Sequence, residues 1–340
     1  MAKLGMPTVV VKFIEAGIEA IQRSQRGIVA LILEDTKQVI DKLATKTNGH
    51  EVLPNPFLVY TVDDIPEELS DKNKDYILKA LKGYNKPPLK IVVYMMQQGG
   101  DKTGADRFQE PLKAMLTERF DYLAIPTIEN AQLEYVATWV KTARENKFKK
   151  IKVVLPSSNA DYEGVINFGN TKVFTADREY KPAEYTARIA GLVAGTNMTQ
   201  SATYAPLAEV IDCDRHTQDE MDAMVNEGKF FIWYDGEKFK MSRAMNSLVT
   251  TSQGKLEGYQ TIKIVDIMDM IYDDIRKTAQ DSYIGKYTND YENKCLLISA
   301  ILGYFKQLEN ERLLQKDYST CEIDCEAVRT YQLSHGLFTK

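Results

Sequence analysis

The feature that most constrains the fold is an alternation of short apolar segments with amphipathic segments between Gly27 and Pro156. Four apolar runs have the length of strands, and helical patterns separate them. The runs are "GIVALIL" (27–33), "LKIVVYMM" (89–96), "DYLAIP" (121–126) and "KIKVVLP" (150–156). Continuously apolar strands are typical of a parallel sheet that helices bury on both faces. We therefore predict an α/β fold with a mainly parallel sheet.

The expected helices lie between these strands, over residues 63–83, 106–120 and 129–146. After residue 156 the pattern is less regular, with two short strands expected around Gly169-Asn170. A hairpin is predicted at Asp235-Gly236, because aromatic residues flank this two-residue turn signal. From about Lys255 the chain turns helical, and we expect two long helices over 261–279 and roughly 288–315.

Composition excludes several classes of protein. The 340 residues suffice for two or three domains, and 43 basic against 48 acidic side chains give a net charge of −5. This balance does not favour generalised nucleic-acid binding. The apolar runs are far shorter than the ~20 residues of a membrane helix. Without an evident signal peptide, we expect the four cysteines to be reduced thiols in a protein made in a cytoplasm.

Most candidate catalytic patterns are incomplete. Lys102-Thr103 follows a glycine-rich turn, but Asp101 occupies the position where a phosphate-binding loop requires glycine. Cys213 and His216 are close in sequence, yet a polar loop before a helix explains both equally well. A calcium loop over the neighbouring acids lacks its turn glycine. These acids are Asp212, Asp214 and Asp219.

An acidic segment, "KIVDIMDMIYDDIRKT" (263–278), is the most conspicuous candidate site. Its apolar stripe at helical spacing, expected to pack inward, consists of Ile264, Met268, Ile271 and Ile275. Asp266, Asp269 and Asp273 fall on a different face. No histidine accompanies them, so a metal site is not favoured. Two interpretations stay open: a solvated face that pairs with Arg276 and Lys277, or an acidic face offered to a partner.

Several long segments resemble, in order, the tail sheath proteins of contractile phage tails. The similarity runs from roughly Arg23 to Leu314 and is most specific after Lys150. It is strongest to sheaths of phages, defective prophages and phage-tail-like (R-type) bacteriocins of Gram-positive bacteria. The segments are "KVVLPSSNADYEGVINFGN", "YTARIAGLVAGTNMTQSATYAPLAEV", "MNSLVTTSQGK" and "IKIVDIMDMIYDDIRKTAQDSYIGKYTNDYENKCLLISAILGYFKQLE".

The resemblance implies a structural protein with no catalytic, cofactor-binding or metal-binding residues. Its fold class would be a multi-domain α/β protein, with a subtilisin-like α/β sheath core and an α+β tube-facing domain that carries an N-terminal arm. Sheath subunits stack as six-fold helical rings around a tail tube, and their contraction drives the tube through a bacterial envelope. The implied partners are other copies of the chain, the tail tube protein, and baseplate and tail-terminator proteins, with no direct nucleic-acid contact and no membrane insertion. The implied location is the particle, after synthesis in the bacterial cytoplasm.

On this basis we expect four parts: an N-terminal arm (1–20), an N-terminal α/β subdomain (21–89), the main sheath domain (90–255) and a helical tube-facing domain (256–340).

The alternating residues Val9, Val11 and Phe13 are the candidate intersubunit arm, because a lone strand must pair with a sheet edge. Asp266, Asp269 and Asp273 are the candidate tube-facing residues. The family usually ends in a second extended arm, whereas this chain ends in "CEIDCEAVRTYQLSHGLFTK" without clear alternation. Either the C-terminal arm is unusual or the chain is a truncated form.

Two other classes of function remain open from the residues alone. One is an enzyme on the same α/β scaffold, either a hydrolase or a nucleotide-dependent enzyme, with Lys102 or His216 in its site. The other is a soluble adaptor that never polymerises.

Overall fold

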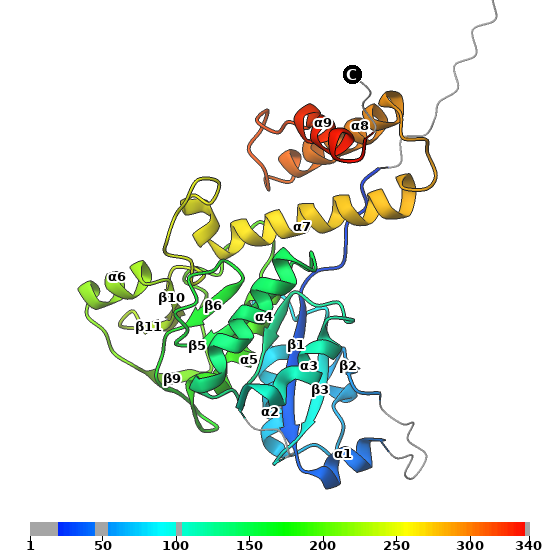
Figure 1. Cartoon of the computed structure of the whole chain (residues 1–340). Helices are drawn as coiled ribbons and strands as arrows, with labels where there is room; N and C mark the ends of the chain where they lie inside the picture. Colours follow the sequence, from blue (N-terminus) through cyan, green and yellow to red (C-terminus); the bar gives the residue numbers. More distant parts are fainter. Residues whose placement is uncertain (1–19, 45–53, 100–103, 337–340) are drawn as a thin grey trace, which may run out of the picture. The chain divides into compact units, whose positions relative to one another are not determined.

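A computed structural model describes residues 20–44, 54–99 and 104–336 (Figure 1). The chain forms two compact units. We call Ser24–Asp273 the sheet unit. The described residues up to Arg23 and from Asp274 onward form the terminal unit. Each unit is described by itself.

A seven-stranded sheet is the centre of the sheet unit, in the order β10-β6-β5-β4-β1-β3-β2. The strand β2 pairs antiparallel with β3, and all other neighbours in this sheet are parallel. This confirms the predicted mainly parallel α/β sheet. The strands are β1 (Ile28–Asp35), β2 (Phe57–Val59), β3 (Lys90–Gln97), β4 (Tyr122–Ala124), β5 (Lys152–Pro156), β6 (Val165–Phe168) and β10 (Lys229–Phe230).

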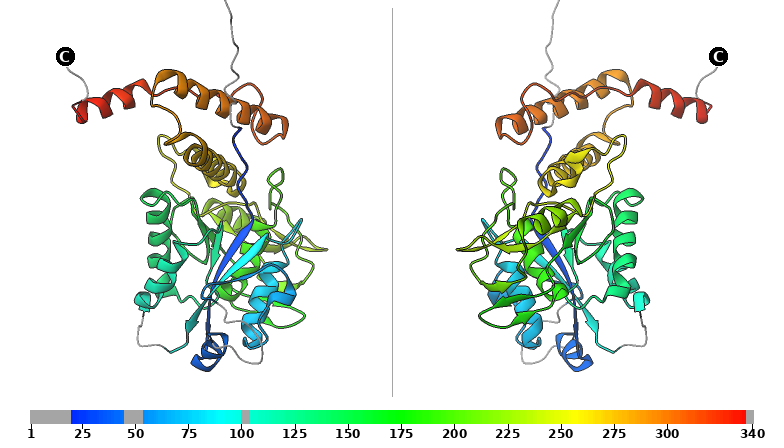
Figure 2. Two further views of the ribbon diagram at one scale, coloured as in Figure 1. Left: turned by 90° about the vertical axis from the view of Figure 1, so that its right-hand side faces the viewer. Right: turned by 90° about the vertical axis from the view of Figure 1, so that its left-hand side faces the viewer.

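Helices cover both faces of this sheet (Figure 2). Alternate residues of β1 enter two different cores. Val29, Leu31 and Leu33 pack in the core that contains α2 (Asp71–Leu81) and α5 (Pro182–Ala194). Ile28, Ala30 and Ile32 pack in the core that contains α3 (Gln109–Met115) and α4 (Leu133–Glu145). Burial on both faces explains why the sequence of β1 is continuously apolar.

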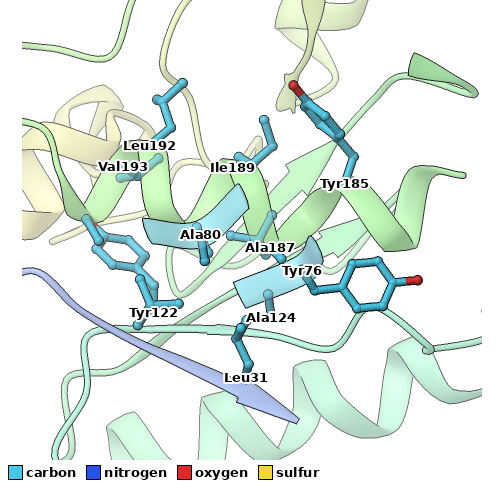
Figure 3. Close-up of a cluster of buried hydrophobic side chains, with 14 of the residues drawn as sticks. Leu31, Tyr76, Ala80, Tyr122, Ala124, Tyr185, Ala187, Ile189, Leu192 and Val193 are labelled. Carbon is cyan, nitrogen blue, oxygen red and sulfur yellow. The ribbon is translucent and has the colours of Figure 1, made fainter. Parts of the chain in front are cut away.

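Helix α5 lies close to α2 within the first of these cores, and Ala80 of α2 lies beside α5 (Figure 3). Gly191 makes this approach possible. A Cβ atom at Gly191 would lie 2.0 Å from the carbonyl oxygen of Ala80. Real Cβ atoms do not approach backbone oxygens so closely, so any larger residue must push the two helices apart.

Smaller elements complete the sheet unit. A three-stranded antiparallel sheet has the order β8-β7-β9, and β11 pairs with β12 in the hairpin that Asp235-Gly236 predicted. These strands are β7 (Val173–Thr175), β8 (Glu179–Tyr180), β9 (Val210–Cys213), β11 (Ile232–Tyr234) and β12 (Phe239–Met241). The remaining helices are α1 (Lys37–Ala44), α6 (Gln218–Asn226) and the 3₁₀ helices Val62–Asp64, Gly104–Phe108, Asn130–Gln132 and Glu257–Gln260.

Two expectations about organisation are wrong. The boundary at residue 89 does not separate two subdomains, because β1 lies between β3 and β4 in one sheet. The helix expected over 63–83 begins only at Asp71. The two short strands expected around Gly169-Asn170 are confirmed as β6, which belongs to the main sheet, and β7, which belongs to the small sheet.

The described part of the terminal unit is helical. It contains the last residues of α7 (Ile262–Thr278), the π-helical turn Ala279–Tyr283, α8 (Tyr291–Asn310) and α9 (Cys325–Ser334). Gln22 and Arg23, which precede the sheet unit in the sequence, are bonded to helical residues of the terminal unit. The amide of Gln22 donates to Oγ1 of Thr278 at 3.0 Å, and Arg23 pairs with Glu311 at 2.5 Å. Within the described residues, no helix is both long and apolar enough to span a membrane.

Replacement of Gly191 by alanine should lower the free energy of unfolding by about 1–3 kcal/mol, because the new Cβ overpacks the contact with Ala80. Gly303 in α8 is the matched control, since a Cβ there meets no atom within 4 Å. Gly303→Ala should be neutral or stabilising by up to about 1 kcal/mol through its better helix propensity. Urea unfolding of both variants measures this. Equal stability of G191A and wild type would contradict the close approach.

Candidate functional site: the charge cluster of helix α7

The acidic segment forms helix α7, but its carboxylates do not lie on a solvated face. Asp269 is only 3% exposed, whereas Ile264, expected to pack inward, is 41% exposed. Met268, Ile271 and Ile275 are half-buried. The prediction that Ile264 packs inward is therefore wrong, and Asp269 does not lie on a solvated face. Asp269 faces the sheet, where it contacts the buried cations Arg144 and Lys152.

Asp269 has two cationic partners. Its two oxygens accept from the guanidinium of Arg144 in α4, each at 2.9 Å. Oδ2 also accepts from Nζ of Lys152 in β5 at 2.6 Å. This bidentate geometry is the strong form of an arginine–carboxylate pair. One carboxylate therefore ties α7 to both a helix and a strand of the sheet unit.

Asp266 lies one turn earlier and shares Lys152. The Lys152 ammonium lies 3.0 Å from Oδ1 of Asp266, and the Tyr122 hydroxyl of β4 donates to the same oxygen at 2.5 Å. Lys152 is fully buried in an otherwise apolar strand. A buried ammonium requires such partners, because an unpaired one would cost several kcal/mol.

Asp273 pairs with a third cation, Arg26, which precedes β1. The guanidinium contacts Asp273 at 2.7 Å and Asp121 at 2.9 Å, and it donates to the backbone carbonyl of Asp269 at 2.5 Å. The other oxygen of Asp121 accepts from the amides of Gly27 and Ile28. We call these eight residues the α7 charge cluster: Arg26, Asp121, Tyr122, Arg144, Lys152, Asp266, Asp269 and Asp273.

The three carboxylates of α7 differ in their electrostatic state. Burial opposes ionisation of Asp269, but Lys152 and Arg144 outweigh it and hold its pKa below the usual value. Burial raises the pKa of Asp266, and Lys152 offsets this only in part. Burial also raises the pKa of Asp273 despite Arg26. Asp269 is thus the carboxylate of α7 whose ionised form the buried cations favour most.

Cys213, the other candidate for which the structure describes the contacts of the reactive atom, is not set up as a nucleophile. Burial raises the pKa of the Cys213 thiol to about 12, and its sulfur lies 3.6 Å from the carbonyl oxygen of Ile232. A nucleophilic cysteine needs the opposite shift. Lys102 and the arm residues lie outside the described part of the chain. Among the residues that the structure describes, no group of three or more potential ligands could hold a metal ion.

Comparison with known proteins identifies the family. The phage tail sheath protein central domain matches residues 101–247, and the phage tail sheath C-terminal domain matches residues 255–339. The tail sheath protein of Clostridium phage phiCD119 is 33% identical over 332 residues, which covers 96% of this chain and 86% of the phage protein. The chain belongs to the phage tail sheath family. It is a structural subunit of a contractile tail sheath.

Solved sheath proteins share the fold of this family member. A sheath tail protein from Desulfitobacterium hafniense superimposes with a TM-score of 0.70 at 20% identity and covers 89% of both chains. The helical sheath of the anti-feeding prophage in its contracted state gives a TM-score of 0.65 at 13% identity. That match covers 91% of this chain and 84% of the other.

Asp269→Asn should lower the free energy of unfolding by about 3–5 kcal/mol at neutral pH, because it leaves Arg144 and Lys152 buried without their shared carboxylate. Asp266→Asn is the matched control and should cost much less, since the amide oxygen still accepts from Tyr122 and Lys152 keeps Asp269. Urea unfolding of both variants measures the difference. Equal losses would contradict the different roles of the two carboxylates.

The pH dependence of stability tests separately whether Asp269 is ionised in the folded state. A carboxylate whose pKa is lowered on folding stabilises above its unfolded pKa, here near 3.8, and the stabilisation disappears as pH falls through the folded value. The stability gap between wild type and Asp269→Asn should therefore shrink below pH 3.8. A gap that widens toward acid pH would contradict an ionised Asp269.

Proposed function

We propose that the chain polymerises with itself into six-fold helical rings around a tail tube, and that contraction of this sheath drives the tube through a bacterial envelope. The observation that carries this proposal is the extent of the similarity. It covers 96% of this chain in a phage tail sheath protein, and the fold match to a contracted helical sheath covers 91%.

The sheet unit would act as the rigid, subtilisin-like core of the sheath subunit, without catalytic, cofactor-binding or metal-binding residues. Support comes from the way its charged groups are used. Asp269, Arg144 and Lys152 are paired with one another, and the Cys213 thiol is held protonated. Groups committed to internal pairs are unavailable for chemistry but stiffen a part that must transmit force.

The N-terminal arm, residues 1–20, would link each subunit to a neighbour, with Val9, Val11 and Phe13 on the pairing side. These three residues lie outside the described part of the chain. The base of the arm supports the idea, because Gln22 and Arg23 are bonded to Thr278 and Glu311. An arm anchored at its base enters a neighbouring sheet by strand addition, and the main-chain hydrogen bonds then supply affinity.

The tube-facing role of Asp266, Asp269 and Asp273 remains a prediction. The contacts within the α7 charge cluster indicate which of the three is most accessible to a partner. Asp269 already satisfies both cations at its carboxylate. Asp273 is the most accessible of the three, with 27% of its side chain exposed. Contact with a tube would therefore involve Asp273 first, in the helical C-terminal part of the chain.

The further partners would be the tube protein, the baseplate and the tail terminator. A baseplate of the anti-feeding prophage contains a chain of this fold, matched at a TM-score of 0.61 over 95% of this chain. We propose that the sheath neither contacts nucleic acid nor inserts into a membrane. The subunit would be made in the bacterial cytoplasm and built into the particle there.

Deletion of residues 1–14 should leave a folded subunit that does not form sheath, because these residues precede the anchored Gln22 and Arg23. Co-expression with the tube protein and electron microscopy measure assembly, and thermal unfolding checks the fold. A second variant replaces Val9, Val11 and Phe13 by serine, which keeps the length of the arm but removes its apolar side chains. Both variants should fail to assemble, and normal sheath from the deleted protein would refute the arm.

A further inference from the structure

Two exposed surfaces lie at opposite edges of the seven-stranded sheet. One is the hairpin β11–β12 with Tyr204 and Arg215, which we call the aromatic hairpin. It follows β10, the strand at one edge. The other surrounds β2, the strand at the opposite edge, and is called the acidic edge. Figure 1 shows β11 and β2 on opposite sides of the sheet unit. The acidic edge consists of Leu58, Tyr60, Val62, Asp63, Glu67 and Glu68.

The aromatic hairpin carries rings on both of its faces. On one face Tyr234 and Phe239 lie with ring centroids 4.9 Å apart, and the Arg215 guanidinium covers the Tyr234 ring at 4.3 Å. On the other face Trp233 lies 6.0 Å from the ring of Tyr204, which is 60% exposed. Tyrosine, tryptophan and arginine are the residues that dominate binding energy at protein interfaces.

The charges of the two surfaces are complementary. Residues 54–71 contain five carboxylates and neither lysine nor arginine. The carboxylate of Asp235 in the aromatic hairpin is already paired with Lys240, and the carboxylate of Asp212 in the neighbouring strand β9 is paired with Arg215. Lys238 and the adjoining Arg243 are exposed and form no ion pair with other residues that the structure describes. Glu237 is also exposed at the turn of the hairpin, so Lys238 and Arg243 leave the hairpin with a net positive charge. The opposite edge presents only carboxylates among its charged groups.

We propose that the aromatic hairpin of one subunit docks on the acidic edge of a second copy of this chain. This inference rests on the proposed function and names one of its contacts. Contact of either surface with itself would place like charges together, which costs energy. Contact between two different surfaces is heterologous, and it repeats from subunit to subunit into a ring or a helical polymer. The exposed apolar side chains Leu58, Tyr60 and Val62 give the aromatic rings a surface to cover.

Charge reversal on each surface tests the contact without disturbing the packed rings. The hairpin variant is Lys238→Glu with Arg243→Glu, and the edge variant is Asp63→Lys with Glu67→Lys. Each should fold normally but polymerise only at about tenfold higher concentration or more, because two interface contacts are lost. Sedimentation velocity of the full chain measures polymerisation, with and without the tube protein. The control is Glu134→Lys with Lys141→Glu on the exposed face of α4, which should assemble as wild type does.

A mixture of the two variants separates this contact from every other arrangement. In an equimolar mixture, a polymer in which the two variants alternate contains only native contacts and contacts with both charges reversed, so polymerisation should return toward the wild-type concentration. Failure of the mixture to assemble, or normal assembly of either variant alone, overturns the proposed contact while the sheath function stands. A hairpin variant that loses only binding to the tube places the tube on this surface and also overturns it. A wild-type chain that never polymerises contradicts both proposals.

Discussion

The contact between Asp269 and the cations Arg144 and Lys152 is the constraint on which much of the sheet unit depends. It joins α7 to α4 and to β5 through a single carboxylate. Removal of any partner would leave a buried charge uncompensated, which costs more than the intact group contributes. Arg26 extends the same network to the segment before β1 through Asp121 and Asp273. One group of charges thus connects α7, the sheet and the segment that leads into β1.

This use of charge suits a sheath subunit. A polymer that contracts changes the contacts between its subunits, and each subunit must keep its own shape while it does so. Apolar cores on both sides of the sheet provide most of the stability, and the close approach of α5 to α2 at Gly191 leaves little freedom between layers. The α7 charge cluster adds directional bonds, which resist sliding better than apolar contacts do.

The sequence predicted the parallel sheet well, because strands buried on both faces must be continuously apolar, as β1 and β3 are. It predicted α7 and α8 from helical spacing, but it assigned the wrong face of α7 to the core. An assignment based on helical spacing alone places every aspartate on the exposed face, whereas Asp269 is buried. A signal was present in Lys152, a lysine within an apolar strand, which must find a buried carboxylate. The carboxylate that pairs with Lys152 depends on long-range packing, which no local sequence pattern encodes.

Long-range packing also explains why the predicted boundary at residue 89 is wrong. The order of strands in the sheet is set by the crossover connections and not by the order of the strands in the sequence.

The most direct test is a cryo-electron microscopy structure of the extended particle, assembled from this chain and its tube protein. In this structure each subunit of the sheath should retain the bidentate contact between Asp269 and Arg144, with Lys152 at the same carboxylate. Particles that lack this chain around the tube would contradict the sheath assignment. A sheath in which Asp269 has left Arg144 and Lys152 and turned toward the tube would contradict the internal role of the α7 charge cluster.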